Sequence, residues 1–408
     1  MIAVLFLFTM FSLSLLILYK EGVLKNRLYG LAAAALLALA FMLRFLCLGH
    51  ETLDYQNFLT RWVDFFRQYG GFAALKHPVG NYNLPYLYFL AAFSYTDYSD
   101  LYLIKFLSIA FDLLLAWGGM KLVTLFTKNA AVRLSAFCGT LLLPTVILNG
   151  AYWAQCDAVY VALAVWALWA ALSKRPKSAL VFMALSFSFK LQAIFFMPVF
   201  FVFFFTGRIR WRDMWIFPAT YVAAVLPAVL AGYPFLDTIT LYFDQAGSIG
   251  SGLNYNSPSL YAFYKGGGDE MQLSRLGIAA AFSFCCILLW WLCMQRKRLN
   301  NTVLFAAFTL SVICIPLFLP HMHDRYFYGA DILSFLLALT ALPLLPLPFL
   351  CSYASLLGYH AYLKMRYLHP MRFGSWALIL AAAMVCAYMV LSFGKAEEKI
   401  LKKRKNNG

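Results

Sequence analysis

GSWALILAAAMVCAYMVLSF, residues 374–393, is an apolar run without a single charge, and a basic tail follows it. About twenty apolar residues are enough to cross a hydrocarbon core of about 30 Å as one helix. The tail, residues 395–408, holds Lys402, Lys403, Arg404 and Lys405 in a row. Basic residues collect on the cytoplasmic side of membrane proteins, where the inner leaflet is anionic. This stretch therefore predicts a last membrane span with a cytoplasmic tail.

Similar apolar runs recur along the whole chain, and the composition agrees with them. Of the 408 residues, 63% are hydrophobic and only 12% are charged, whereas an average soluble domain has about 25% charged residues. The formal net charge of +16 fits basic cytoplasmic loops, and we expect no nucleic-acid partner. Residues 2–19 lack a positive segment before the apolar run, so they are interpreted as a retained span rather than a cleaved signal.

The apolar runs alternate with basic clusters, which predicts about thirteen spans with the N-terminus outside and the tail inside. The runs cover 2–19, 28–47, 101–120, 134–150, 157–173, 178–206, 213–232, 276–294, 302–319, 329–363 and 374–393. Two of them, 178–206 and 329–363, are too long for one helix, and we expect breaks near 190–198 and at the prolines of 343–348. The segment 84–96 is too short to span, which predicts a helix at the outer surface.

The expected fold class is therefore an all-α polytopic membrane protein with a single membrane domain, residues 1–394, followed by the tail 395–408. Two large segments, 48–100 and 233–275, are expected on the extracytoplasmic side. The second carries GSGLNYNSPSLYAFYKGGG, in which Asn254 and its neighbours have side chains that suit sugar hydroxyls. The same composition also fits any exposed flexible loop.

The first outer segment begins with an acid that has two possible roles. Asp54 precedes an amphipathic helical pattern over 55–69, and such a helix lies in the membrane interface. Asp54 would then stand near the membrane surface, where it could act on a substrate. The alternative is that Asp54 only caps the helix, as Asp often does at a helix N-terminus.

Further polar side chains occur at the outer ends of the predicted spans. The loop 321–328 reads HMHDRYFY, and His321, His323 and Arg325 together suit a phosphate. Asp324 with the two histidines could instead bind a metal ion, or the histidines could be held by backbone carbonyls. Lys190 lies near the expected break of 178–206, where a charge either faces a polar site or snorkels to the interface.

Gln192 follows Lys190 closely enough to share one site with it, and Gln155 and Asp157 lie in NGAYWAQCD on the outer side. Arg44 and Asp112 are charges inside predicted spans, and each could pair within the helix bundle.

The order of these motifs along the chain resembles that in the GT-C superfamily of membrane glycosyltransferases. The resemblance is strongest to bacterial proteins related to GPI mannosyltransferases and dolichol-dependent glucosyltransferases. The resemblance covers most of the chain and rests on short motifs. They are Asp54-Tyr55 with Arg61-Trp62, Asn81-Tyr82-Asn83-Leu84-Pro85, Lys105 with Asp112, Trp153-x-Gln155-x-Asp157, Phe189-Lys190-Leu191-Gln192, and His321-x-His323-x-Arg325-Tyr326-Phe327.

The resemblance implies a GT-C-like bundle that moves a sugar from a polyprenyl-phosphate donor to an acceptor hydroxyl outside the cytoplasm, with inversion. Asp54 stands at the family's general-base position. Donor phosphate contacts are implied for Lys190, His321, His323 and Arg325. Acceptor or sugar contacts are implied for Arg61, Asn83, Gln155, Asp157, Gln192 and Asn254. A hexose such as mannose and a cell-envelope glycan or glycolipid are the expected sugar and acceptor, at the plasma membrane.

Cationic side chains can stabilise the leaving phosphate without a general acid. The motifs identify no certain cofactor, and a divalent metal is a possible one. The alternative function is a transporter or flippase of lipid-linked sugars. A transporter predicts charges spread through the spans and similar halves, whereas these polar residues gather at one predicted face.

Overall fold

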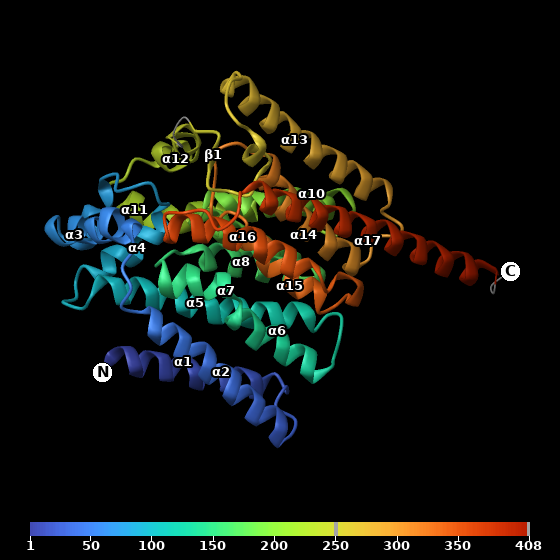
Figure 1. The fold of residues 1–408 in the computed structure, drawn as a ribbon, viewed down its shortest axis with the longest axis horizontal. Helices are drawn as coiled ribbons and strands as arrows, with labels where there is room; N and C mark the ends of the chain where they lie inside the picture. Colours follow the sequence, from blue (N-terminus) through green and yellow to red (C-terminus); the bar gives the residue numbers. More distant parts are fainter. Residues whose placement is uncertain (249–251, 406–408) are drawn as a thin grey trace. The chain divides into compact units, whose positions relative to one another are not determined.

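A computed structural model of the chain describes residues 1–248 and 252–405. In this part of the chain, helices make up nearly all of the regular structure, and the β-structure is one parallel pair of two-residue strands. Two compact units are present: Met1–Ala193 with Arg212–Gly250 form unit 1, and Ile194–Trp211 with Ser251–Gly408 form unit 2. Figure 1 shows the helices of both units coloured along the sequence.

The elements of unit 1 are α1 (Ile2–Lys20), α2 (Arg27–Cys47), η1 (Tyr55–Leu59), α3 (Thr60–Gln68), η2 (Gly71–Lys76), α4 (Leu84–Phe93), α5 (Asp100–Val123), α6 (Ala130–Leu142), α7 (Pro144–Val146), η3 (Ile147–Tyr152), α8 (Asp157–Leu172), α9 (Pro176–Phe189), α11 (Ile216–Leu230) and α12 (Phe235–Ser248). The elements of unit 2 are α10 (Met197–Phe205), β1 (Asn254–Tyr255), η6 (Leu260–Phe263), α13 (Glu270–Met294), α14 (Asn301–Phe318), β2 (Met322–His323), α15 (Tyr328–Ala338), η7 (Leu342–Leu344), α16 (Leu347–Leu363) and α17 (Arg372–Lys405). Two short turns, η4 (Leu191–Phe196) and η5 (Trp211–Asp213), lie where the chain passes between the units.

The helices confirm an all-α polytopic membrane fold. Among the described residues, eight helices are long and apolar enough to cross a membrane, and the bent pair Ala130–Leu142 with Pro144–Tyr152 makes a ninth. Four further apolar helices of the predicted spans are shorter: Asp157–Leu172, Pro176–Phe189, Leu191–Phe205 and Tyr328–Ala338. The total of thirteen spans and their orientation stay predictions, because the shorter helices fall below the length that crosses a bilayer by itself.

Both long apolar runs break where the sequence predicts. The α9 helix ends at Phe189, Lys190 has an extended backbone, and α10 begins at Met197. The second run divides into α15 and α16, with the prolines of η7 and of the α16 N-terminus between them. Proline lacks the N–H that continues a helix, which explains the second break.

The core of unit 1 is organised around α8. Almost every residue of α8 is buried, and the helix packs against α5 and α9. A helix that is apolar on all sides, as α8 is, must be covered by protein or lipid on all sides. Its first residue, Asp157, is consequently carried into the interior of the unit.

The first loop of unit 1 forms the helical structure that its amphipathic pattern predicts. The π-helical turn η1 runs directly into α3, whose buried residues include Val63 and Phe66. The short helix predicted within 84–96 is α4, which packs against α3, η2 and α9. These elements cover the apolar side chains of α4. The helix can therefore be stable without crossing the membrane, although it has few polar residues. A position at the outer membrane surface remains a prediction.

The predicted orientation can be tested at the two ends of α5. Ser99 precedes this helix and Lys128 follows it, and both are exposed. In a protein whose native cysteines have been replaced, we expect Ser99→Cys to react with a membrane-impermeant maleimide on intact cells. Lys128→Cys should react only after the membrane is opened. Labelling of Lys128→Cys in intact cells, without labelling of Ser99→Cys, would reverse the assignment of the two faces.

Candidate active site

Asp54 lies directly before η1, and its carboxylate accepts two hydrogen bonds. Trp153 Nε1 donates to Asp54 Oδ2 at 2.9 Å, and Gln155 Nε2 donates to the same oxygen at 2.7 Å. Tyr82 OH in turn donates to Gln155 Oε1 at 2.9 Å. Trp153 and Gln155 are buried, whereas Asp54 is partly exposed. Two segments that are distant from Asp54 in sequence, the loop with Trp153 and Gln155 and the segment with Tyr82, therefore orient a carboxylate that remains partly exposed.

The capping alternative for Asp54 is wrong. Asp54 occupies the residue before η1, but its backbone is already helical and its side chain caps no backbone N–H. The side chain instead points to Trp153 and Gln155. Its neighbour Tyr55 is a poor alternative as a base, because burial raises the pKa of the Tyr55 phenol above its usual value. The phenol therefore stays protonated near neutral pH.

The loop that carries Trp153 and Gln155 is rigidly held between η3 and α8. Thr52 Oγ1 donates to the carbonyl of Trp153 at 3.0 Å, and Ser108 Oγ donates to the carbonyl of Gln155 at 2.6 Å. Ala154 between them has a φ of 65°. A left-handed backbone is costly for a residue with a Cβ, and such residues concentrate at functional sites. The loop is thus kept in a strained conformation that aims both donors at Asp54.

Asp157 forms a second polar centre with Lys190. Lys190 Nζ makes an ion pair with Asp157 Oδ1, and Asn149 Nδ2 donates to Asp157 Oδ2 at 2.8 Å. The Asp157 side chain is 1% exposed and that of Lys190 is 10% exposed. The ammonium also lies over two aromatic rings, 5.7 Å from the ring centre of Tyr82 and 5.8 Å from that of Tyr160. Pairing inside the unit contradicts the snorkelling alternative for Lys190.

The remaining predicted residues of unit 1 have different environments. Asn83, at the start of α4, is buried and donates to the carbonyl of Phe187 at 3.4 Å. Arg61 is exposed on α3. Gln192, in η4, has a buried Oε1 without a hydrogen-bond partner in the described part of the chain. The sugar-binding roles of these residues stay predictions.

The loop of unit 2 that contains the histidines is built on the small sheet. His321 has a φ of 60°, its Nδ1 lies 2.8 Å from the Gly252 carbonyl, and its Nε2 lies 3.2 Å from Ser274 Oγ. His323 stacks on Tyr255 with ring centres 4.7 Å apart. Both ring nitrogens of His321 therefore have partners in unit 2, which is the contact pattern of the structural alternative. The phosphate role of His321 and His323 remains untested.

Arg325 and Asn254 also take part in the structure of unit 2. Arg325 NH1 lies 3.8 Å from Asp324 Oδ1, and the Arg325 side chain is 16% exposed. Asn254 Oδ1 accepts from the N–H of Ser257, and Asn254 Nδ2 donates to the Ser257 carbonyl. Asn254 is one of the residues around a cavity of about 500 Å³. The other residues around the cavity are Asn256, Tyr261, Ala262, Tyr264, Tyr367, Leu368, His369, Pro370 and Met371.

A metal centre receives no support from residues 1–248 and 252–405, where no group of three or more His, Cys, Asp or Glu side chains could hold an ion. Sequence reasoning did not assign roles to four residues that complete the centres of unit 1: Tyr82, Asn149, Trp153 and Tyr160. Asn149 could have been noticed as a polar residue in an apolar span. Tyr82 and Trp153 belong to quoted motifs, yet only the folded chain brings them to Gln155 and Asp54.

The fold and the site define a class of protein. It is a multi-pass membrane protein with an accessible carboxylate and a buried ion pair at the ends of its helices. The family model of glycosyltransferase family 87 matches residues 81–320. The chain belongs to this family of GT-C-type membrane glycosyltransferases, which confirms the GT-C resemblance. A search of curated proteins found no match. The matched range contains Gln155, Asp157 and Lys190 but not Asp54.

Proposed function

We propose that this glycosyltransferase is an inverting enzyme that uses a polyprenyl-phosphate-sugar donor. It transfers a hexose, such as mannose, to a hydroxyl of a cell-envelope glycan or lipid at the extracytoplasmic face of the plasma membrane. The observation that carries the proposal is the Asp54 carboxylate, held by Trp153 and Gln155 and still partly exposed. A hydroxyl becomes a good nucleophile as a base removes its proton during attack.

The leaving group of such a donor needs positive charge rather than a general acid. A polyprenyl phosphate leaves as a phosphate anion, and preorganised cations stabilise the charge that develops on it. In unit 1 the cation that we assign to this role is Lys190, which pairs with Asp157. An ammonium has three donors, so Lys190 can bind a phosphate oxygen while it remains paired with Asp157. Arg325 is the corresponding candidate in unit 2.

The acceptor side of the proposal rests on unit 2. The cavity beside Asn254 combines amides with tyrosines, of which Tyr367 is exposed. Amide groups can bind sugar hydroxyls, and aromatic rings offer apolar faces for stacking. The lining side chains include no acid. We propose that this cavity binds sugar residues of a glycan.

The proposed function is tested by incubating the purified protein with a labelled polyprenyl-phosphate sugar and envelope glycan. We expect release of polyprenyl phosphate together with labelled glycan of inverted anomeric configuration. A protein that moves the intact labelled lipid across vesicles, without releasing polyprenyl phosphate, would be a flippase instead. Transfer from a nucleotide sugar alone would refute the lipid-linked donor.

Removal of the cation at Lys190 should reduce turnover by about 10–100-fold, because a hydrogen bond to a charged group contributes about 1.5–3 kcal/mol. Lys190→Gln alone would leave Asp157 buried without its counter-ion. The prediction is therefore tested by sugar transfer in the double variant Lys190→Gln/Asp157→Asn, in which neither charge remains. Arg325→Lys, which keeps the charge but loses the bidentate fork, should also lower turnover.

Arg366→Lys, an exposed substitution in the loop between α16 and α17, is the matched control for Arg325→Lys and should retain the original rate. Thermal unfolding checks that each variant folds. Near-normal donor binding and turnover in folded Lys190→Gln/Asp157→Asn and in Arg325→Gln would assign both cations a structural role only.

A further inference from the structure

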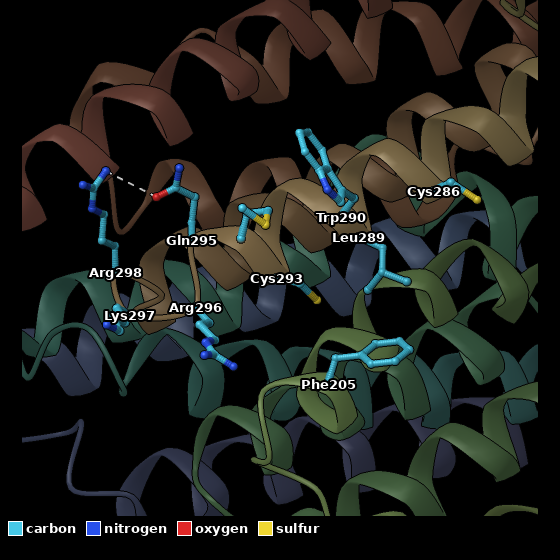
Figure 2. A pocket seen from close by; sticks show the side chains of 10 residues that line it. Phe205, Cys286, Leu289, Trp290, Cys293, Gln295, Arg296, Lys297 and Arg298 are labelled. Atoms are coloured by element: carbon cyan, nitrogen blue, oxygen red, sulfur yellow. Dashed lines mark hydrogen bonds between the residues drawn. The ribbon is translucent and has the colours of Figure 1, made fainter.

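We propose that a groove of unit 2, at the C-terminal ends of α10 and α13, binds an anionic phospholipid. The groove has a volume of about 890 Å³. The side chains that line it belong to α10, to α13 and to the loop after α13: Phe205, Cys286, Leu289, Trp290, Cys293, Met294, Gln295, Arg296, Lys297 and Arg298. Figure 2 shows these side chains around the end of α13. This inference goes beyond the proposed sugar transfer.

One wall of the groove is apolar and uncovered. Cys286, Leu289, Trp290 and Cys293 recur at three- and four-residue intervals, so they follow one side of α13. Trp290 is 65% exposed and Phe205, on α10, is 53% exposed. The stretch from Cys286 to Met294 is about 12 Å long at 1.5 Å per residue. A hydrocarbon chain lying along this side would cover apolar surface that the unit itself leaves open.

The end of the groove is positively charged. Arg296, Lys297 and Arg298 follow Gln295, the residue after α13, and Arg296 and Lys297 are exposed. Arg298 NH1 donates to Gln295 Oε1 at 3.3 Å, the dashed line in Figure 2, which holds its side chain beside the loop. The segment 295–300 contains no acidic residue. Arg296 and Lys297 therefore have no acidic neighbour within this segment.

A second basic segment reaches the same end of unit 2. Arg208, which follows α10, donates from NH2 to the Leu299 carbonyl at 2.9 Å. This bond joins the end of α10 to the loop after α13, and α10 packs against α13. Basic pockets between membrane helices are suited to anionic lipid head groups. An apolar wall that ends in cations matches a molecule with a hydrocarbon chain and an anionic head, which is an anionic phospholipid.

The charges lie on loops predicted to be cytoplasmic, whereas the proposed function uses its donor at the opposite face. The expected ligand is therefore a phospholipid of the anionic cytoplasmic leaflet, and polyprenyl phosphate is the competing ligand in the experiment below. Trp290 supplies the probe, because bromine atoms on a lipid chain quench tryptophan fluorescence only at contact. The signal of Trp290 is the difference between the wild-type protein and Trp290→Phe.

The full-length protein is reconstituted in phosphatidylcholine vesicles that contain an equal fraction of either brominated phosphatidylglycerol or brominated phosphatidylcholine. We expect the brominated phosphatidylglycerol to quench Trp290 several-fold more effectively. Each basic side chain near a membrane surface contributes about a five-fold preference. Arg296→Gln/Lys297→Gln should therefore remove most of the preference while leaving quenching by brominated phosphatidylcholine unchanged.

Lys364→Gln/Arg366→Gln, two exposed cations between α16 and α17, is the matched control and should keep the preference. Equal quenching by the two brominated lipids in the wild-type protein would overturn the proposal. An unchanged preference for brominated phosphatidylglycerol in Arg296→Gln/Lys297→Gln would overturn it as well. Displacement of brominated phosphatidylglycerol by a small molar amount of polyprenyl phosphate would assign the groove to the sugar donor instead. None of these readings requires sugar transfer, so they are independent of the proposed function.

Discussion

Replacement of Asp54 by Asn should slow sugar transfer by about 10²–10⁴-fold, which is the usual contribution of a general base. The asparagine side chain keeps the size of Asp54, and its carbonyl oxygen can still accept from Trp153 Nε1 and Gln155 Nε2. It cannot take the proton of an acceptor hydroxyl. The fold and donor binding are therefore expected to survive while turnover is lost, as measured by release of polyprenyl phosphate at saturating donor.

Asp64→Asn is the matched control, because Asp64 lies in the same loop on α3, where it pairs with the exposed Arg67 at 2.6 Å. Loss of that surface pair costs about 0–1 kcal/mol and should not change the rate. If folded Asp54→Asn protein transfers sugar within a few-fold of the wild-type rate, Asp54 is not the base. Asp157 would then be the next acid to test, although its carboxylate is already engaged by Lys190 and Asn149.

Replacement of Arg44 by Met should destabilise the protein by about 3–5 kcal/mol, the usual result of leaving one partner of a buried ion pair alone. Arg44 on α2 donates from Nε and NH2 to Asp112 Oδ2 on α5, at 3.2 and 2.8 Å. Arg44 NH1 also donates to the Leu141 carbonyl of α6 at 2.8 Å. Both side chains are fully buried. Thermal or denaturant-induced unfolding in detergent micelles measures the loss.

The double variant Arg44→Met/Asp112→Leu separates the cost of an unpaired charge from the loss of packing. Apolar residues of similar volume often replace a buried ion pair without loss of stability. We expect the double variant to recover most of the stability that Arg44→Met loses. Equal destabilisation of the single and double variants would mean that the backbone contact with α6, rather than the charge pair, holds these helices together.

The helices could be predicted from the sequence because apolar length is a property of consecutive residues. The run 302–319 became α14, and the run 178–206 broke at Lys190 as expected. Arg44 and Asp112 were each expected to be able to pair within the helix bundle, and the structure shows that they pair with each other. The capping alternative failed for Asp54, and the snorkelling alternative failed for Lys190. The partners of these residues come from distant segments.

By itself, the sequence determined the class of the protein: a polytopic helical membrane protein of the GT-C type, with its motifs near the ends of the helices. Hydrophobic length and short motifs carry this information without any knowledge of packing. Only the tertiary structure decided which side chains share a site. Trp153 reaches Asp54, and Lys190 reaches Asp157, because α5, α8 and α9 pack together and the strained loop at Ala154 turns its donors inward. Hydrogen bonds are short and directional, so their partners are fixed by how helices pack rather than by how each helix forms.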